Sequence, residues 1–181
     1  MKPPFLASDD APEVIELHYQ RAIEGIELLH GAITQGQPPD SFFGYTRAEA
    51  YDALVELRRE VDQQMSLALV ASFEALFRID CFNRIHYRMK SGIGPRVRGK
   101  DRTFALECRL EEILDLWKEV GVEAHRAGDF KKLLERRHWL AHGRYWDDST
   151  TQQINPLIVR TVVDALSAEI QQRCDDFPLL A

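Results

Sequence analysis

The sequence predicts an all-α fold, a bundle of four or five helices, and three observations support this prediction. Apolar residues recur at intervals of three and four through most of the chain, which is the periodicity of an amphipathic helix. No segment alternates apolar and polar residues in the way a half-buried strand does, and no segment repeats. Residues typical of helix ends and turns separate the periodic segments. Helices connected in this way pack as a bundle around a shared core.

The chain of 181 residues is long enough for one domain with a core of its own. Residues 1–10 are expected to form a flexible N-terminal arm, and residues 11–181 a single helical domain. Pro12 is placed to open the first helix, whose apolar stripe extends to about residue 34. The stretch 36–44, rich in proline and glycine, then predicts a loop.

A capping box opens the second and longest helix. Thr46 and Glu49 have the spacing in which each side chain binds the backbone N–H of the other residue. The apolar periodicity continues from there to about residue 90. Within this helix Glu74 and Arg78 stand four residues apart, so they lie on the same face. They form either a surface pair of little structural importance or a buried pair that holds Arg137 or His142 in place.

The charge of the chain changes after this helix. Between residues 84 and 102 there are seven lysines or arginines and one acid, and the segment 91–101 contains three glycines and a proline. Arg96, Arg98 and Lys100 form the tip of this segment, which is expected to be flexible. The segment is either a solvated loop or a basic clamp whose cations contact nucleic-acid phosphates without reading the base sequence.

Three further helices complete the predicted bundle, and each has a recognisable start. Asp101 or Thr103 is placed to cap the third helix. Asp129 is the expected N-cap of the fourth. Asn155 followed by Pro156 is a strong signal for the start of the last helix, with the asparagine as N-cap and the proline in the first turn.

Composition and charge narrow the classes of function. A net charge of −6 argues against a protein that coats nucleic acid nonspecifically, although it allows a local basic groove. No secretory signal segment is recognised, and the most apolar run, residues 67–77, is too short to cross a membrane. The cysteines are odd in number and far apart, which predicts reduced thiols in a cytoplasmic protein. They are Cys81, Cys108 and Cys174.

Residues 136–146 concentrate arginine, histidine and aromatic side chains near the end of the fourth predicted helix. Arg137 lies in line with the apolar face of this helix, where a charge needs a partner. His138 and His142 are four residues apart and therefore lie on one side. Gly143 is expected to end the helix, which places His142 in the last turn, where the carbonyls favour a protonated imidazole. The apolar face itself contains Phe130, Leu133, Leu134 and Ala141.

This combination suits phosphodiester chemistry, because a histidine can move protons near neutral pH while a guanidinium holds negative charge. The sequence lacks the motifs that are typical of other hydrolytic mechanisms. The sequence contains no H-E-x-x-H pattern, no cluster of cysteine and histidine, and no group of carboxylates at metal-ligand spacing. It also lacks the G-x-S-x-G turn of a serine hydrolase. We therefore expect neither a metal nor a cofactor.

The motif resembles the signature of HEPN domains, in which an arginine is followed four to six residues later by a histidine. Here Arg137 and His142 have that spacing, and His138 fills the polar position after the arginine. The ending Leu140-Ala141-His142-Gly143 is also similar to the family's apolar-small-His-Gly pattern. The architectural resemblance covers roughly residues 46–175. It implies a small all-α bundle, and many members are metal-independent endoribonucleases of toxin–antitoxin and antiviral systems that act as homodimers.

On this interpretation RNA is cleaved by transesterification at the 2′-OH. His142 removes the 2′-OH proton or protonates the leaving 5′ oxygen, and Arg137 stabilises the charged phosphorane. His138 positions one of these groups or shares the proton transfer. Two copies of the motif, one from each subunit, would provide both histidines. Arg136 also fits the spacing limits of the motif, and Arg137 is preferred because His138 then occupies the polar position.

Residues around the motif are candidates for binding the substrate. Arg136, Arg144 and Tyr145 flank the expected catalytic groups, and the loop residues Arg96, Arg98 and Lys100 are candidates for more distant phosphates. Trp139 and Tyr145 either stack RNA bases or belong to the core.

Two alternatives stay open from the sequence. The chain is either an enzyme or a catalytically inactive HEPN-type module that binds RNA or a protein partner, and an arginine and a histidine at this spacing also occur as idle surface residues. The resemblance further implies an antitoxin partner such as a nucleotidyltransferase. In some pairs that partner modifies a tyrosine two residues after the histidine. Here the position holds Arg144, with Tyr145 one residue later, which departs from the pattern.

Overall fold

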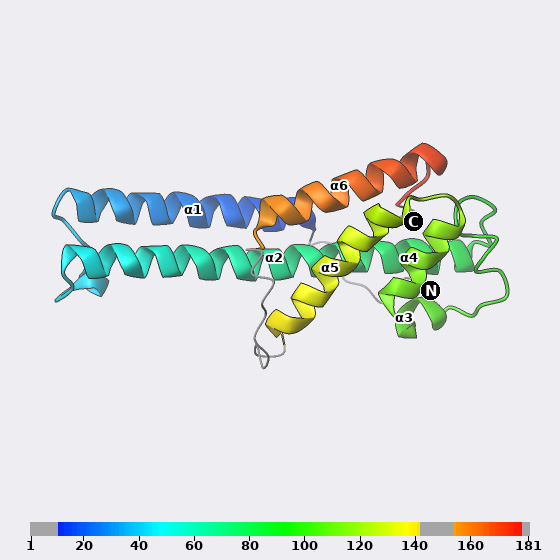
Figure 1. Ribbon diagram of the computed structural model, residues 1–181, viewed down its shortest axis with the longest axis horizontal. Helices are drawn as coiled ribbons and strands as arrows, with labels where there is room; N and C mark the ends of the chain where they lie inside the picture. Colours follow the sequence, from blue (N-terminus) through cyan, green and yellow to red (C-terminus); the bar gives the residue numbers. More distant parts are fainter. Residues whose placement is uncertain (1–10, 142–153, 179–181) are drawn as a thin grey trace.

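The structure is a computed structural model, and it describes residues 11–141 and 154–178. Within these residues all regular structure is helical, so the prediction of an all-α bundle is confirmed (Figure 1). The expected arm of residues 1–10 lies outside the described residues. The elements are α1 (Pro12–Thr34), the 3₁₀ turn η1 (Asp40–Phe42), α2 (Arg47–His86), α3 (Phe104–Glu107), α4 (Leu110–Glu119), α5 (Ala124–Ala141) and α6 (Pro156–Arg173).

Helix α2 is the axis of the molecule, and the other helices pack along it (Figure 1). The predicted capping box begins it: the Thr46 N–H donates to Glu49 Oε2 at 2.7 Å, and the Glu49 N–H donates to Thr46 Oγ1 at 3.3 Å. The helix ends at His86 rather than near residue 90. The reason is local, because Arg88 adopts φ 50°, a left-handed conformation that an α-helix cannot contain.

The third predicted helix is two helices in the structure, α3 and α4, separated by two extended residues, Cys108 and Arg109. Arg78 of α2 donates to the carbonyls of Ala105 and Cys108 at 3.0 Å each, which fixes the backbone at this break. A second helix start follows immediately, because the Arg109 N–H donates to Glu112 Oε1 at 3.1 Å. Because Arg78 is 27 and 30 residues away from its two acceptors, the sequence around Cys108 does not indicate that the helix breaks there.

The start of the fourth predicted helix was also wrong. Helix α5 begins at Ala124, and both Gly128 and Asp129 lie inside it. Asp129 forms an ion pair with Lys132 at 3.0 Å instead of capping the helix. The start of α6 is confirmed, since the side chain of Asn155 accepts a hydrogen bond from the Ile158 N–H at 2.9 Å.

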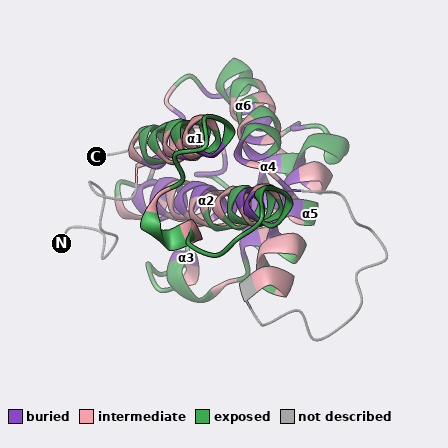
Figure 2. Cartoon of the chain, turned by 90° about the vertical axis from the view of Figure 1, so that its left-hand side faces the viewer, coloured by how far each residue is buried: buried purple, intermediate pink, exposed green. Residues whose placement is uncertain are grey.

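The main core lies along the second half of α2, where α4, α5 and α6 cover it. The buried residues lie on the sides of the helices that face one another (Figure 2). Its largest apolar members are Trp117, Phe77, Phe82 and Phe130. The outer halves of α1 and α2 project away from this core as a two-helix arm (Figure 1). That arm has a separate small cluster made of Ile33, Ala50 and Leu54.

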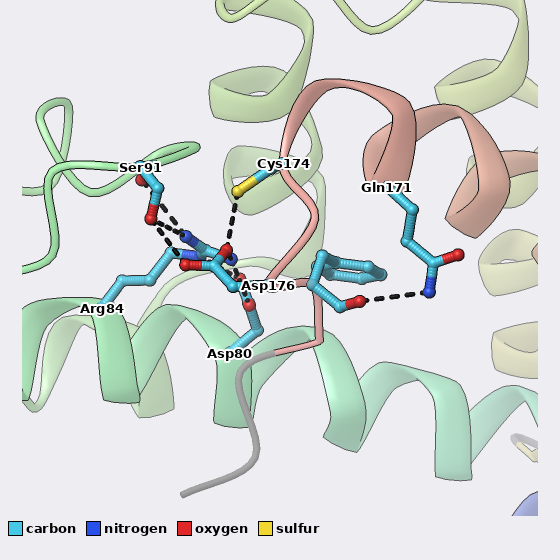
Figure 3. Close-up of polar contacts among 7 residues, drawn as sticks. Asp80, Arg84, Ser91, Gln171, Cys174 and Asp176 are labelled. Carbon is cyan, nitrogen blue, oxygen red and sulfur yellow. Dashed lines mark hydrogen bonds and ion pairs between the residues drawn. The ribbon is translucent and has the colours of Figure 1, made fainter.

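At the other end of α2 a buried arginine joins this helix to the segment that follows it and to the residues after α6 (Figure 3). Arg84 is fully buried, and its Nε and Nη2 donate to the two oxygens of Asp80 at 2.8 and 2.9 Å. Nη2 also donates to Asp176 Oδ1 at 2.8 Å. Nη1 donates to the carbonyl and hydroxyl oxygens of Ser91, both at 3.2 Å. The face of Trp117 lies 5.2 Å from the guanidinium carbon.

The residues after α6 are held down by the same group. Asp176 Oδ2 accepts from the Ser91 hydroxyl at 2.7 Å, and its Oδ1 accepts from the Cys174 thiol at 2.8 Å. Burial raises the pKa of Asp176, but the hydrogen bonds from Cys174, Ser91 and Arg84 outweigh burial and lower it to about 2. The hydrogen bonds of the folded state therefore stabilise the ionised carboxylate of Asp176.

Stability is expected to depend on Asp176 in acid. An aspartate in an unfolded chain has a pKa of about 3.9, whereas that of Asp176 in the fold is about 2. A lowered pKa stabilises the fold above the unfolded value, so this contribution, on the order of 2 kcal/mol, is lost as the pH falls from about 4 to 2. Urea unfolding at several pH values should show a shallower loss in Asp176→Asn, while Asp175→Asn on the exposed neighbour serves as control. An identical pH dependence in Asp176→Asn and the native protein would contradict the expectation.

Candidate functional site

The described part of the candidate motif, residues 136–141, lies at the C-terminal end of α5, a helix that crosses the second half of α2 (Figure 1). Phe130, Leu133 and Leu134 are buried, as the apolar stripe of the sequence predicted. Arg137, one turn further along, departs from the stripe. Its side chain is 40% exposed, and the charge reaches the surface rather than the core.

Arg137 has the partner that a charge in this position needs. Its Nη1 lies 3.3 Å from Oε2 of Glu74 on α2. The other oxygen of Glu74, Oε1, accepts from Nε and Nη2 of Arg78 at 3.0 and 2.9 Å. The side chains of Glu74 and Arg78 are only 20% and 15% exposed. Of the two interpretations of the Glu74 and Arg78 pair, the structure supports the half-buried pair that holds a side chain of the site.

The residues beside Arg137 differ in their surroundings. The guanidinium carbon of Arg136 lies 4.1 Å from the centre of the Trp139 ring, a close cation–π contact. Trp139 is half-buried, and His138 is exposed. Leu140 packs against the main core. The two candidate arginines therefore have separate roles in the fold, one stacked on an aromatic ring and one paired with a carboxylate.

The other half of the motif lies outside the described residues. Helix α5 ends at Ala141, and His142, Gly143, Arg144 and Tyr145 follow it in the sequence. The described part of the site is thus its arginine side, with Arg137 in place on α5.

The basic segment after α2 is anchored at two points. Ile93 and Val97 are buried, so these two side chains attach the segment to the core. Arg96 and Arg98, on either side of Val97, are exposed, and Arg96 Nε lies 3.5 Å from Glu119. Lys100 is exposed and lies 4.8 Å from the centre of the Phe104 ring. The buried Val97 thus holds the backbone between Arg96 and Arg98 against the core, while their charged side chains face solvent.

Two residues of this region have properties that the sequence did not reveal. The charge pattern of the sequence groups Arg84 with the basic segment, but its side chain is buried and paired with Asp80 and Asp176. His86, in the last turn of α2, has a buried Nδ1 without a hydrogen-bond partner. Burial and the nearby charge of Arg102 lower the pKa of His86. The exposed positive charges at this end of α2 therefore include Arg96, Arg98 and Lys100 of the basic segment but not Arg84.

Other kinds of site were sought among the described residues. In residues 11–141 and 154–178 no three histidine, cysteine or acidic side chains are grouped so as to hold a metal ion. None of the helices described is long and apolar enough to cross a membrane. A pocket of about 370 Å³ lies between α1 and α2 on the arm, lined by Ile26, Tyr51 and Val55 among others. None of the candidate residues of the motif or the basic segment lines it.

The fold and the described half of the site define an all-α bundle that presents a carboxylate-held arginine at the end of a helix. Comparisons with protein-family models, with curated proteins and with solved structures find no match for this chain. The resemblance to HEPN domains therefore depends on the motif and on the helical architecture.

Proposed function

We propose that this protein is a metal-independent endoribonuclease of the HEPN type that cleaves RNA by transesterification at the 2′-OH. The observation that carries the proposal is Arg137, fixed at the surface by Glu74 at 3.3 Å and five positions before His142 in the sequence. Because the contact with Glu74 uses Nη1 of the guanidinium, the other nitrogens of Arg137 have N–H groups that can donate to a phosphate.

The chemistry assigned to the site needs two kinds of group. Arg137 stabilises the negative charge that develops on the phosphorane, where a planar guanidinium can contact two oxygens at once. His142 moves the proton of the 2′-OH or of the leaving 5′ oxygen, and His138, exposed beside Arg137, assists it. The cation–π pair of Arg136 with Trp139 forms one flank of the site, and the proposal gives Arg144 and Tyr145 a role in binding RNA.

One copy of the motif contains one His142, whereas acid and base catalysis uses two proton-transferring groups. We therefore propose a two-fold homodimer in which two motifs face one cleft. A toxin or defence role, with an antitoxin such as a nucleotidyltransferase, follows from the same resemblance. The departure at Arg144 bears on how such a partner would act on this chain.

The experiment that tests the function is incubation of the purified protein with end-labelled RNA in EDTA. Fragments should form with the native protein and be absent with His142→Ala. The rival function, an inactive binding module, predicts a shift of RNA mobility without fragments in both proteins. If the native protein produces no fragments and no shift of RNA mobility, both functions are ruled out.

The basic segment provides a separate prediction. If Arg96, Arg98 and Lys100 contact phosphates, replacing all three with glutamine should weaken RNA binding. The slope of log affinity against log salt should flatten by about 2, because each contact with single-stranded RNA contributes about 0.7. Filter binding over a range of salt concentrations measures both quantities. A triple replacement at Arg21, Arg58 and Arg59 on the two-helix arm is the matched control, and equal slopes for the two triple variants would assign the segment to solvent.

A further inference from the structure

We infer that Glu74 is a positioning residue of the candidate site, whose carboxylate holds the guanidinium of Arg137 in the orientation that the scissile phosphate requires. The inference depends on the proposed ribonuclease function and adds to it a residue on another helix, more than sixty positions away from the motif.

The first support is the way Glu74 divides its two oxygens between two arginines. Oε1 accepts from both Nε and Nη2 of Arg78, at 3.0 and 2.9 Å, so two charge-assisted hydrogen bonds hold this one oxygen in place. Oε2 is thereby directed to Nη1 of Arg137 at 3.3 Å. Rotation of the carboxylate away from Arg137 would cost the contacts with Arg78.

The second support is that Arg78 itself is fixed by backbone groups. Its Nη1 donates to the carbonyls of Ala105 and Cys108, both at 3.0 Å. Contacts therefore run without interruption from the backbone around α3, through Arg78 and Glu74, to Arg137. Exposure of the side chains increases along this path, from 15% for Arg78 to 20% for Glu74 and 40% for Arg137. The path starts in the half-buried interior and ends at the surface where a substrate can reach it.

The third support is the charge that the trio retains. Arg78 and Arg137 contribute two positive charges and Glu74 one negative charge, so the sum is +1. The contact with Glu74 uses Nη1 of Arg137, and a guanidinium has five N–H donors in a fixed plane. Glu74 can thus orient Arg137 without neutralising the site for an anionic phosphate. The pair of Arg59 with Glu56 differs in burial, since both of its side chains are about half exposed, at 47% and 52%.

Replacing Glu74 with glutamine separates positioning from a general effect on the fold. The amide has one oxygen, so it can serve one arginine while its NH₂ group opposes the donors of the other. We expect kcat for RNA cleavage to fall by about 10- to 100-fold, the size of effect that a misplacement of about 1 Å produces. KM should stay unchanged or fall, because a negative charge near the phosphate is removed. Glu74→Asp, which keeps the charge, should recover part of kcat.

Glu56→Gln on the same helix is the matched control and should leave both constants unchanged. An equal kcat in Glu74→Gln and the native protein would overturn the inference. Faster cleavage by Glu74→Gln would also overturn it, since Glu74 would then compete with RNA for Arg137. A simple loss of folded protein would lower the apparent kcat of Glu74→Gln and of Glu74→Asp together, without the recovery expected for the aspartate.

A chemical readout separates this inference from the proposed function. Phenylglyoxal modifies accessible arginines, and mass spectrometry reports the rate at Arg137. Modification should be several-fold faster in Glu74→Gln than in the native protein and unchanged in Glu56→Gln. If the native protein does not cleave RNA, the proposed function fails, and the role of Glu74 in catalysis fails with it even where Arg137 is protected. If RNA is cleaved but modification and kcat are unchanged in Glu74→Gln, only the inference about Glu74 fails.

Discussion

Replacing Arg84 with methionine is expected to lower the free energy of unfolding by about 3 to 5 kcal/mol, the cost of breaking a buried ion pair by removing one partner. Methionine fills the volume of the arginine stem, but it leaves the fully buried Asp80 and the partly buried Asp176 without their shared cation. Ser91 also loses the donors that hold it. Because a domain of this kind is stabilised by about 5 to 15 kcal/mol, such a loss is a large part of the total.

Urea unfolding followed by circular dichroism measures the effect. Arg59→Met, at an exposed ion pair on the same helix, is the control and should change the free energy of unfolding by less than about 0.5 kcal/mol. The double variant Asp80→Leu with Arg84→Met should be more stable than Arg84→Met alone, because it removes the uncompensated buried charge. A change of less than about 1 kcal/mol in Arg84→Met would show that this cluster does not hold the C-terminal residues.

The second large effect concerns catalysis. Arg137→Lys and His142→Ala are each expected to reduce the rate of RNA cleavage by about 100-fold or more. Lysine keeps the charge but lacks the planar fork that contacts two phosphate oxygens, so it should not restore activity. Arg137 is 40% exposed, and surface ion pairs contribute about 1 kcal/mol or less, so Arg137→Lys should remain folded.

Helix α5 offers matched controls for both replacements. Arg126→Lys and His125→Ala change the same residue types at exposed positions near the other end of the helix, and they should leave the rate unchanged. Cleavage is measured in single-turnover assays, and circular dichroism confirms helicity. Unchanged rates in Arg137→Lys and His142→Ala would move the active site elsewhere. Loss of activity together with loss of helicity would show a structural role for this stretch.

Local chemistry explains which parts of the fold were predictable. Thr46 with Glu49, and Asn155 with Pro156, each begin a helix through contacts within three residues, and both starts are confirmed. The break between α3 and α4 depends on Arg78, which is distant in sequence, so periodicity continued across it. The start of α5 was misplaced because Gly128 and Asp129 are tolerated inside a helix, and a side chain at Gly128 would meet no atom within 4 Å.

In the candidate site, too, the sequence predicts the local features but not the contacts between distant residues. Periodicity placed Arg137 beside an apolar face and indicated that its charge needs a partner, but it left open whether Glu74 with Arg78 was that partner. Only the packing of α5 on α2 decides this, because the two helices are far apart in the chain. Likewise, composition grouped Arg84 with the basic segment, whereas its burial depends on Asp176 near the other end of the chain.

The measurement that tests the central claim most directly is the chemical identity of the RNA ends formed by the native protein in EDTA. Transesterification by Arg137 and His142 without a metal predicts fragments with a 2′,3′-cyclic phosphate on one side and a free 5′-hydroxyl on the other. Mass spectrometry of the fragments, together with labelling of the 5′-hydroxyl by a polynucleotide kinase, identifies both ends. Fragments that carry a 3′-hydroxyl and a 5′-phosphate, or RNA that stays intact at micromolar protein, would contradict it.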